Sequence, residues 1–321
     1  MLGHSSMQSS SARWWWYGVY VAVLLAIGYA LHAAGDRIEY SWRWERIPQY
    51  LVSNEGTELK ASFDGFVSVG ADGKSLTLKE LKGGRRETLT GFDDLLVGDG
   101  DLVFQNDPLA RKRGLVPGPL TLGLWMTLRI SAVALLFSML LGLAAGLGRV
   151  SRNPAAYGLA TTYVELIRGT PLLVQIFIFY FFVGTVLKLS AFTAGVAALA
   201  VFTGAYVAEI VRAGIEAIPK GQMEAARSLG MSVPQAMRHV ILPQAFKKTL
   251  PPLAGQFINL IKDSSLVSVM ALTDLTKAGR EVVASTFSPF EVWFTVAAMY
   301  LVLTGTLSWC VRRLEKRLAH D

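Results

Sequence analysis

Apolar residues in this chain gather into long uncharged blocks, and most charged residues lie in the stretches between them. A helix needs about 20 such residues to cross the hydrocarbon core of a bilayer. One further block, residues 249–273, is apolar except for Lys262 and Asp263 near its middle. The pattern therefore predicts an all-α integral membrane protein with about six transmembrane helices. The five uninterrupted blocks are residues 14–31, 130–148, 170–187, 189–208 and 292–311.

Composition supports a membrane protein. Of the 321 residues, 52% are hydrophobic and 17% are charged, whereas a soluble domain carries about 25% charge. The net charge of +7 raises the question of nucleic-acid binding. However, residues 35–116 hold 12 basic and 14 acidic residues, and the remainder holds 19 and 10. The basic excess thus lies in loops between apolar blocks, which favours a role in membrane orientation and no nucleic-acid partner.

The distribution of Lys and Arg predicts the orientation. With a cytoplasmic N-terminus, the short inside segments hold thirteen basic residues and the short outside loops hold three. Positive charge favours the inside, so we expect both termini in the cytoplasm and residues 35–116 outside it. The first block exceeds the 7 to 15 residues of a signal-peptide core, and Trp14–Tyr17 suit an interfacial aromatic belt, so we expect it to be retained.

Residues 35–116 are expected to form a small β-rich extracytoplasmic insert. Two short, partly alternating runs, 63–69 and 75–79, flank Asp72-Gly73, a dipeptide typical of hairpin turns. Its role is not readable, and a spacer or docking surface is the default interpretation. The predicted division of the chain is an N-terminal anchor, residues 14–34, the insert, 35–116, and a helical domain, 119–318.

The most informative stretch is the long loop between the blocks that end at 208 and begin at 249. It contains Glu224-Ala225-Ala226, three residues, Gly230, nine residues, and then Val240-Ile241-Leu242-Pro243. This fits the pattern EAA-x3-G-x9-I-x-L-P, with valine in place of the isoleucine. Six of the seven defined positions are matched over twenty residues and the seventh is a conservative replacement, which is very rare by chance. The competing interpretation is an ordinary amphipathic loop on the membrane surface.

Local signals predict two short helices in this loop. The first covers residues 222–229, with Glu224 and Arg227 as surface neighbours and Gly230 as the stop. The second begins near Ser232, a suitable N-cap, with Pro234 in its first turn. Leu242-Pro243 would end or kink that helix. Such a rigid helix pair can dock in a partner's groove and transmit motion.

The pattern resembles the EAA signature of bacterial ABC importer membrane subunits, and flanking segments resemble the polar amino-acid permease family, of the histidine, glutamate, glutamine, arginine and opine type. Those segments are Arg168–Leu173, Gly204–Ile210, Gly221-Gln222, Leu242–Ala245 and Lys262–Leu266. The likeness covers about residues 120–318. Serine at 264 stands where threonine is commoner in the family, and many relatives have only five core spans. Nothing about residues 35–116 follows from the resemblance.

The resemblance implies an importer for polar amino acids in the bacterial inner membrane. Two permease subunits, identical or related, would sit on two ATP-binding subunits and receive substrate from an extracytoplasmic binding protein. The core would have five helices, preceded here by an extra N-terminal helix, all surrounded by membrane lipid. The residues implied to couple to the ATPase are Gln222, Glu224, Ala225, Ala226, Arg227, Gly230, Leu242 and Pro243.

Polar residues within the apolar blocks are candidates for the substrate path. Charges deep in a bilayer cost several kcal/mol unless they pair or face water. Lys262 and Asp263 suit the carboxylate and ammonium of an amino acid, and the alternative is an internal salt bridge between helices. Ser264, Asn259, Thr170 and Gln175 complete the candidate path. Near other block ends, Glu165 with Arg168 and Glu209 with Arg212 are expected to be structural pairs, and Pro171 is expected to loosen the third block.

Two other classes of protein compete with the permease. A membrane-anchored sensor or scaffold would bind a ligand through the insert and a signalling protein through the loop, but it needs neither the EAA pattern nor buried charges. A membrane-embedded enzyme lacks support because no catalytic constellation stands out. The four histidines are too scattered for a metal site. We therefore expect no enzymatic activity in this chain, no metal and no cofactor.

Overall fold

The computed structural model describes residues 10–38, 40–53, 56–70 and 73–318. The chain divides into two compact units at Trp44/Glu45, and each is described by itself. In the first unit the long element is α1, Ser10–Arg37, which carries a stretch, Trp14–Gly35, long and apolar enough to cross a membrane. Aromatic side chains gather at its start, where Trp15 and Trp16 meet edge to face.

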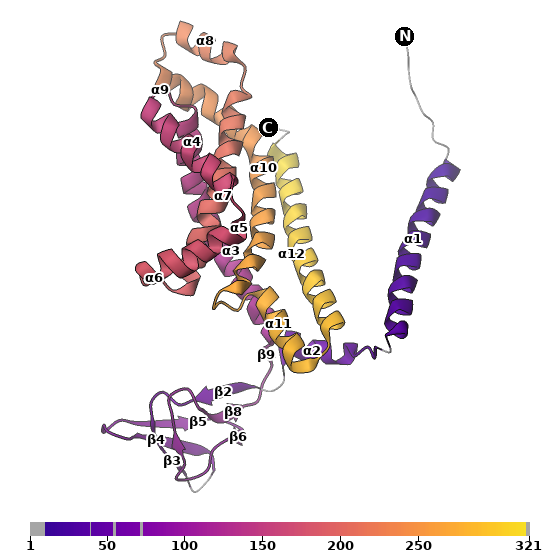
Figure 1. The fold of residues 1–321 in the computed structure, drawn as a ribbon, viewed down its shortest axis with the longest axis vertical. Helices are drawn as coiled ribbons and strands as arrows, with labels where there is room; N and C mark the ends of the chain where they lie inside the picture. The colour runs from indigo at the N-terminus through magenta and orange to yellow at the C-terminus, as the bar shows by residue number, and fades with distance from the viewer. Residues whose placement is uncertain (1–9, 39, 54–55, 71–72, 319–321) are drawn as a thin grey trace. The chain divides into compact units, whose positions relative to one another are not determined.

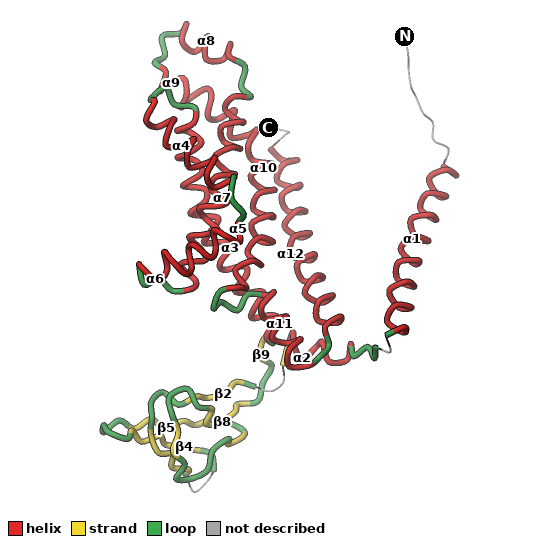
Figure 2. Tube along the Cα trace, in the orientation of Figure 1, coloured by secondary structure: helices red, strands yellow, loops and turns green. Residues whose placement is uncertain are grey.

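The second unit is mostly helical (Figures 1 and 2). Together with α1, four helices of the described chain are long and apolar enough to cross a membrane, or up to five if one bent pair counts as a single span. The finding fits a multi-pass membrane protein. The helices after the strands are α3 (Pro119–Arg149), α4 (Pro154–Arg168), α5 (Leu172–Phe177), α6 (Gly184–Val186), α7 (Ala191–Glu216), α8 (Lys220–Ser228), α9 (Val233–Ala236), α10 (Leu242–Asp263), α11 (Leu275–Thr286) and α12 (Pro289–Leu318).

Close packing of α3 on α7 forms the centre of this unit. A ridge of small residues on α3 makes it possible, since Ser138, Gly142 and Gly146 are all buried. A Cβ placed on Gly142 would lie 2.4 Å from the Cβ of Val207 on α7. Small residues let helix backbones approach closely in lipid, where dispersion replaces the hydrophobic effect as the main attraction. The packing ridge that the four-residue spacing indicates is therefore used.

The third apolar block, residues 170–187, is helical over Leu172–Val186 as expected, and a sharp bend joins this stretch to the helix before it. Helix α4 ends at Arg168 and α5 begins at Leu172, and the two are bent by 104°. Pro171 lies at the break, where its missing N–H and the restricted residue before it disfavour a continuous helix. Beyond α5, a π-helical segment η2, Ile178–Val183, leads into α6.

The sixth apolar block also differs from its prediction. Helix α10 begins at Leu242, before the block starts, and ends at Asp263, where a 3-10 segment η4, Ser264–Val269, takes over. The hydroxyl of Ser264 donates to the carbonyl of Ile261 at 2.7 Å, a local bond that satisfies a carbonyl at the end of the helix. Lys262 and Asp263 consequently lie at the C-terminal end of a helix and not in the middle of one.

Strands occupy the stretch before α3. After the short η1 (Trp44–Arg46) and α2 (Ile47–Leu51), one sheet has the order β5-β4-β3-β7 and another has β2-β8-β6. The ends of the stretch meet, because β1 and β9 pair antiparallel. Asp72 of the expected hairpin lies outside the described residues. The strands are β1 (Val52–Ser53), β2 (Thr57–Lys60), β3 (Gly65–Val69), β4 (Ser75–Glu80), β5 (Arg86–Thr90), β6 (Asp94–Leu95), β7 (Leu102–Val103), β8 (Pro108–Lys112) and β9 (Val116–Pro117).

Alternation explains why β3 and β4 fold as they do. Val67 of β3 and Leu76 and Leu78 of β4 are almost fully buried, while residues between them face outward. In a strand, successive side chains point to opposite faces, so one face of this sheet packs inward. Leu109 and Phe92 join the same apolar cluster from outside the hairpin. This stretch therefore has a core of its own.

Candidate functional site

The first helix of the EAA loop ends where its sequence predicts. Helix α8 covers Lys220–Ser228, close to the expected 222–229. The N–H of Met231 donates to the carbonyl of Ala226, and that of Gly230 to Arg227. These two bonds form a Schellman motif, in which the residue after the helix adopts a left-handed conformation. Gly230 has φ +86°, which glycine adopts without strain.

The second helix begins as predicted but does not end at the proline. Ser232 and Gln235 form a reciprocal capping box, and Pro234 lies in the first turn of α9. From there the chain stays helical through a π-helical segment η3, Met237–Ile241, into α10. Pro243 lies in the first turn of α10, so it neither ends nor visibly breaks the helix. A π-turn just before a proline lets the backbone hydrogen bonds of the helix adjust to the missing N–H of the proline. The sequence pattern does not reveal this adjustment.

The loop has an apolar inner side and a polar outer side. Ala226 of α8 and Ile241 of η3 are buried, and Met223 shares the apolar cluster of Ile241 with residues of α7 and α3. Helix α8 packs mainly on η3 and α9, so a displacement of α8 would pass through η3 to α10, because packed apolar surfaces resist separation. The exposed predicted coupling residues are Gln222, Glu224, Ala225, Arg227, Gly230 and Pro243, while Leu242 is half-buried.

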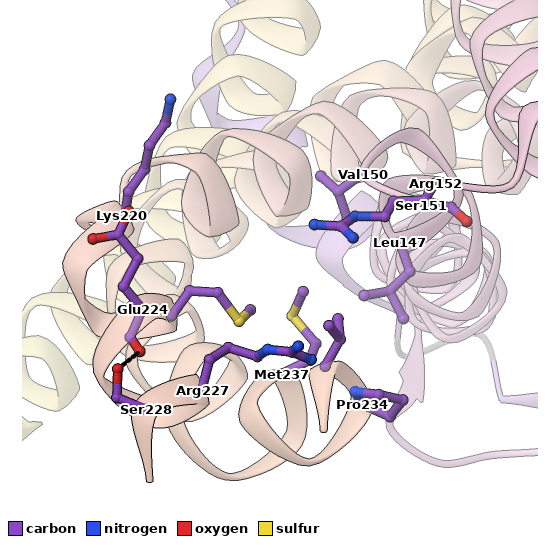
Figure 3. Close-up of a pocket in the computed structure, with 12 residues that line it drawn as sticks. Leu147, Val150, Ser151, Arg152, Lys220, Glu224, Arg227, Ser228, Pro234 and Met237 are labelled. Atoms are coloured by element: carbon purple, nitrogen blue, oxygen red, sulfur yellow. Dashed lines mark hydrogen bonds between the residues drawn. The ribbon is translucent and has the colours of Figure 1, made fainter. Parts of the chain in front are cut away.

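A cavity of about 950 Å³ separates α8 from the end of α3. Figure 3 shows Arg152 and Arg227 extending toward the space between them, while Lys220 points outward. Glu224, expected to neighbour Arg227, forms no ion pair with it among the described residues. Its backbone carbonyl accepts a hydrogen bond from Ser228 at 3.0 Å. The charged groups here are thus free to meet a partner.

Glu209 of α7 is the centre of an ionic cluster. Its carboxylate is 2.5 Å from Nη1 of Arg149 on α3, 3.6 Å from Arg168 on α4, and contacts Arg212 as well. The guanidinium of Arg168 also lies over the ring of Tyr206. The expected Glu209–Arg212 pair is present. The expected Glu165–Arg168 pair is not among the described ion pairs, since Glu165 is 3.6 Å from Arg149.

The polar end of α10 contains charges without an ion-pair partner. Lys262 and Asn259 are exposed and Asp263 is half-buried. Within the described residues, neither Lys262 nor Asp263 has an opposite charge within 4.0 Å. The alternative of a salt bridge between helices of this chain is therefore not what the structure contains. Ser264 is fully buried and its hydroxyl is engaged by Ile261.

Thr170 and Gln175 stabilise the bend between α4 and α5. The side-chain amide of Gln175 donates to the carbonyl of Ile167 at 2.8 Å and to the hydroxyl of Thr170 at 2.8 Å. Gln175 is only 4% exposed, whereas Thr170 is exposed. These bonds satisfy carbonyls at the end of α4, which a broken helix leaves open. The geometry gives Gln175 a positioning role at the bend.

In the part of the chain that the structure describes, no group of three or more His, Cys, Asp or Glu residues lies close enough to hold a metal ion. His4 and His320 lie outside that part. The free Cys310 is exposed.

Comparison with known families decides what this arrangement is. A family described as "Binding-protein-dependent transport system inner membrane component" matches residues 138–320, more than half of the chain. The chain belongs to this family. It is the permease of an ABC importer, a multi-pass inner-membrane component and not an enzyme, and ATP is hydrolysed by a partner subunit. Membership favours the importer over a sensor or scaffold.

Relatives of the permease are amino-acid transporters. It is 48% identical over 197 residues to the probable glutamine ABC transporter permease protein GlnM of Bacillus subtilis, covering 61% of this chain and 91% of that one. The glutamine transport system permease protein GlnP of Escherichia coli (strain K12) is 41% identical over 199 residues, with the same shares. The likeness takes in 61% of this chain, and the family match begins at residue 138, after the strands.

Solved structures agree on the fold. A crystal structure of an amino acid ABC transporter with histidines matches with a TM-score of 0.59 and 44% identity, covering 62% of the permease and 94% of that chain. An inward-facing structure of the MetNI methionine ABC transporter, 23% identical, matches with a TM-score of 0.57 over 62% and 96% of the two chains. The latter shows a shared fold.

Sequence spacing did not predict that Glu209 also forms ion pairs with Arg149 and Arg168 on other helices. Pairs three residues apart can be read from one helix, but a carboxylate bound by three helices cannot. We expect Glu209→Gln in the permease to lower the free energy of unfolding by about 1–2 kcal/mol, because two half-buried guanidinium groups, Arg149 and Arg212, and the exposed Arg168 lose their common counter-charge. Thermal unfolding in nanodiscs measures it. Glu216→Gln, which removes an exposed partner of Arg212 alone, is the control and should change it by less than about 0.5 kcal/mol.

Proposed function

We propose that the permease imports a polar amino acid of the glutamine type. Both relatives are named as glutamine permeases, and the alignment covers 91% of the length of each. The family match, residues 138–320, takes in α10, which carries the unpaired Lys262 and Asp263. A zwitterion with a neutral polar side chain offers a carboxylate to the first and an ammonium to the second. Asn259, exposed one turn earlier, can bond the side chain.

The substrate path in this proposal is lined by the polar end of α10. The candidates differ in solvent exposure. Asn259 and Lys262 are exposed, Asp263 is half-buried, and Ser264 and Gln175 are buried. We assign the first three to contact with substrate, and Thr170, Gln175 and Ser264 to holding the surrounding backbone. Charged groups deep in a membrane protein are tolerated where they face water or cargo.

The transport cycle in this proposal is driven through α8. Two ATP-binding subunits, a second permease and an extracytoplasmic binding protein complete the importer. The observation that carries the proposal is the two-sided loop, in which Ala226 and Ile241 are buried while Glu224 and Arg227 are exposed. Docking of the outer side on an ATPase would shift the inner side, and through η3 the helix α10. This links ATP binding to the path as a coupling between distant sites.

The proposed topology has six crossings with both termini in the cytoplasm. Helix α10 supplies the sixth, since its 22 residues make about 33 Å of helix, enough for a hydrocarbon core of about 30 Å. Residues 14–34 then form the N-terminal anchor, 35–116 a β-rich domain outside the membrane, and 119–318 the permease domain. The paired ends of the middle stretch, β1 with β9, suit an insertion that leaves the helical domain intact.

Deleting Glu224–Gly230 tests the proposal. We expect the variant to lose co-purification with the ATPase and substrate-dependent uptake in proteoliposomes, because the outer side of α8 is removed. The point variant Glu224→Lys, which leaves the caps of α8 intact, should show the same direction of change. Removal of residues 82–86, an exposed turn between β4 and β5, is the control and should keep ATPase association. Uptake and association that survive both loop variants would overturn the proposal.

A further inference from the structure

The cavity beside α8 carries an excess of positive charge that the EAA pattern does not explain. Arg152 and Arg227 extend into it, Lys220 belongs to its lining with an ammonium that points outward, and Glu224 is the one acid among the lining residues (Figure 3). Within the described residues none of these three cations has an opposite charge within 4.0 Å. Nearby arginines behave differently, because Arg149 and Arg212 are both bound by Glu209. The cavity is therefore a basic site whose counter-charge is not supplied by its own lining.

Arg152 is held in place by its own turn. The side chain of Asn153 accepts hydrogen bonds from the N–H groups of Ala155 and Ala156, and Pro154 follows in the first turn of α4. The N–H of Asn153 in turn donates to the hydroxyl of Ser151 at 3.1 Å. A capped and proline-led turn has few alternative conformations. Arg152 thus extends from a defined position on the wall facing α8 (Figure 3).

Apart from Ser151 and Ser228, the rest of the lining is apolar. Leu147 and Val150 come from the end of α3, Met223 from α8 and Met237 from η3. Methionine side chains adapt to the shape of what they contact. A small inorganic anion would satisfy the cations but leave this apolar surface and most of the 950 Å³ unused. The lining therefore suits a polypeptide segment that presents both apolar and acidic side chains.

We propose that this cavity receives an acidic, partly apolar segment of the ATPase subunit, with Arg152 as a second anchor opposite α8. The inference rests on the proposed function, because the cavity opens beside the loop assigned there to the ATPase. It adds that the α3–α4 turn takes part in docking. The segment of the ATPase then contacts the permease on two sides, at α8 and at the end of α3. Motion of the docked subunit reaches α3 directly as well as through the loop.

Reversal of the charge at Arg152 tests this inference in the assembled transporter. We expect Arg152→Glu to weaken binding of the ATPase to the nanodisc-reconstituted permease about tenfold, and to flatten the dependence of the affinity on salt. Arg152→Lys, which keeps the charge, should stay within about twofold of the parent. Arg312→Glu, an equal charge change at an exposed position of α12, is the matched control. Equal affinity of Arg152→Glu and the parent would overturn the inference.

A photo-cross-linker placed at Ser151 identifies the occupant. In the purified transporter we expect an adduct between the permease and the ATPase subunit, mapped to a segment rich in Asp and Glu. An adduct with lipid or within the permease, or no adduct at all, contradicts the inference. The two proposals fail differently: loss of binding on Glu224–Gly230 deletion with normal Arg152→Glu binding defeats only the second anchor. Binding that survives both changes defeats the coupling role of the loop itself.

Discussion

Lys262→Met is expected to lower substrate uptake by the reconstituted transporter strongly while leaving the complex assembled. Methionine keeps most of the length and apolar volume of the side chain, so packing at the end of α10 should survive. What disappears is the positive charge, which has no opposite charge within 4.0 Å among the described residues and is exposed. A charge that pairs with nothing in its own chain is retained in a membrane helix only where it has a function or reaches water.

The measurement is uptake of radiolabelled glutamine in proteoliposomes loaded with ATP, at a tenfold range of substrate concentration. We expect a loss of about 10- to 100-fold, since the substrate carboxylate loses its charged donor and a hydrogen bond to a charged group contributes about 1.5–3 kcal/mol. Lys277→Met is the control, because its ammonium lies 4.0 Å from Glu281 on α11, in an ordinary i,i+4 pair. Normal uptake by Lys262→Met would remove this lysine from the path.

Gly142→Ala is expected to destabilise the permease strongly, although it adds one methyl group. The new Cβ would lie 2.4 Å from the Cβ of Val207 and 2.8 Å from the carbonyl oxygen of Gly204. Both contacts are to atoms fixed on the backbone of α7, so relief requires the helices to separate. Overpacking of this kind lowers the free energy of unfolding by about 1–3 kcal/mol. Here it would separate α3 from α7, the pair at the centre of this unit.

Unfolding of the detergent-solubilised permease, followed by a thermal shift, measures this loss. Gly158→Ala is the matched control, because a Cβ there meets nothing within 4 Å. That variant should be neutral or slightly more stable, given the better helix propensity of alanine. A double variant, Gly142→Ala with Val207→Gly, should recover part of the loss if the contact is its cause. Equal stability of Gly142→Ala and Gly158→Ala would contradict close packing at this point.

Local sequence signals predicted much of the candidate site. Caps and stops act within a few residues, so Ser232, Pro234 and Gly230 could be read as the boundaries of α9 and α8. The ridge at Gly142 and Gly146 follows from helical spacing alone. The end of α10 could not be read in this way. The apolar block continues past Asp263, and the hydropathy of a segment does not distinguish an α-helix from the 3-10 helix that begins at Ser264.

Hydrophobic blocks by themselves determined that this protein crosses the membrane several times, and the local caps around the EAA spacing determined two short helices in its long loop. Both are properties of residues close together in the chain, where propensity and burial in lipid act alone. Only the tertiary structure decided that Glu209 binds guanidinium groups from three helices, that Gln175 is a buried clamp, and that Arg152 faces α8 across a cavity. Such pairings depend on which helices meet, because a side chain bonds with whatever group packing brings within reach.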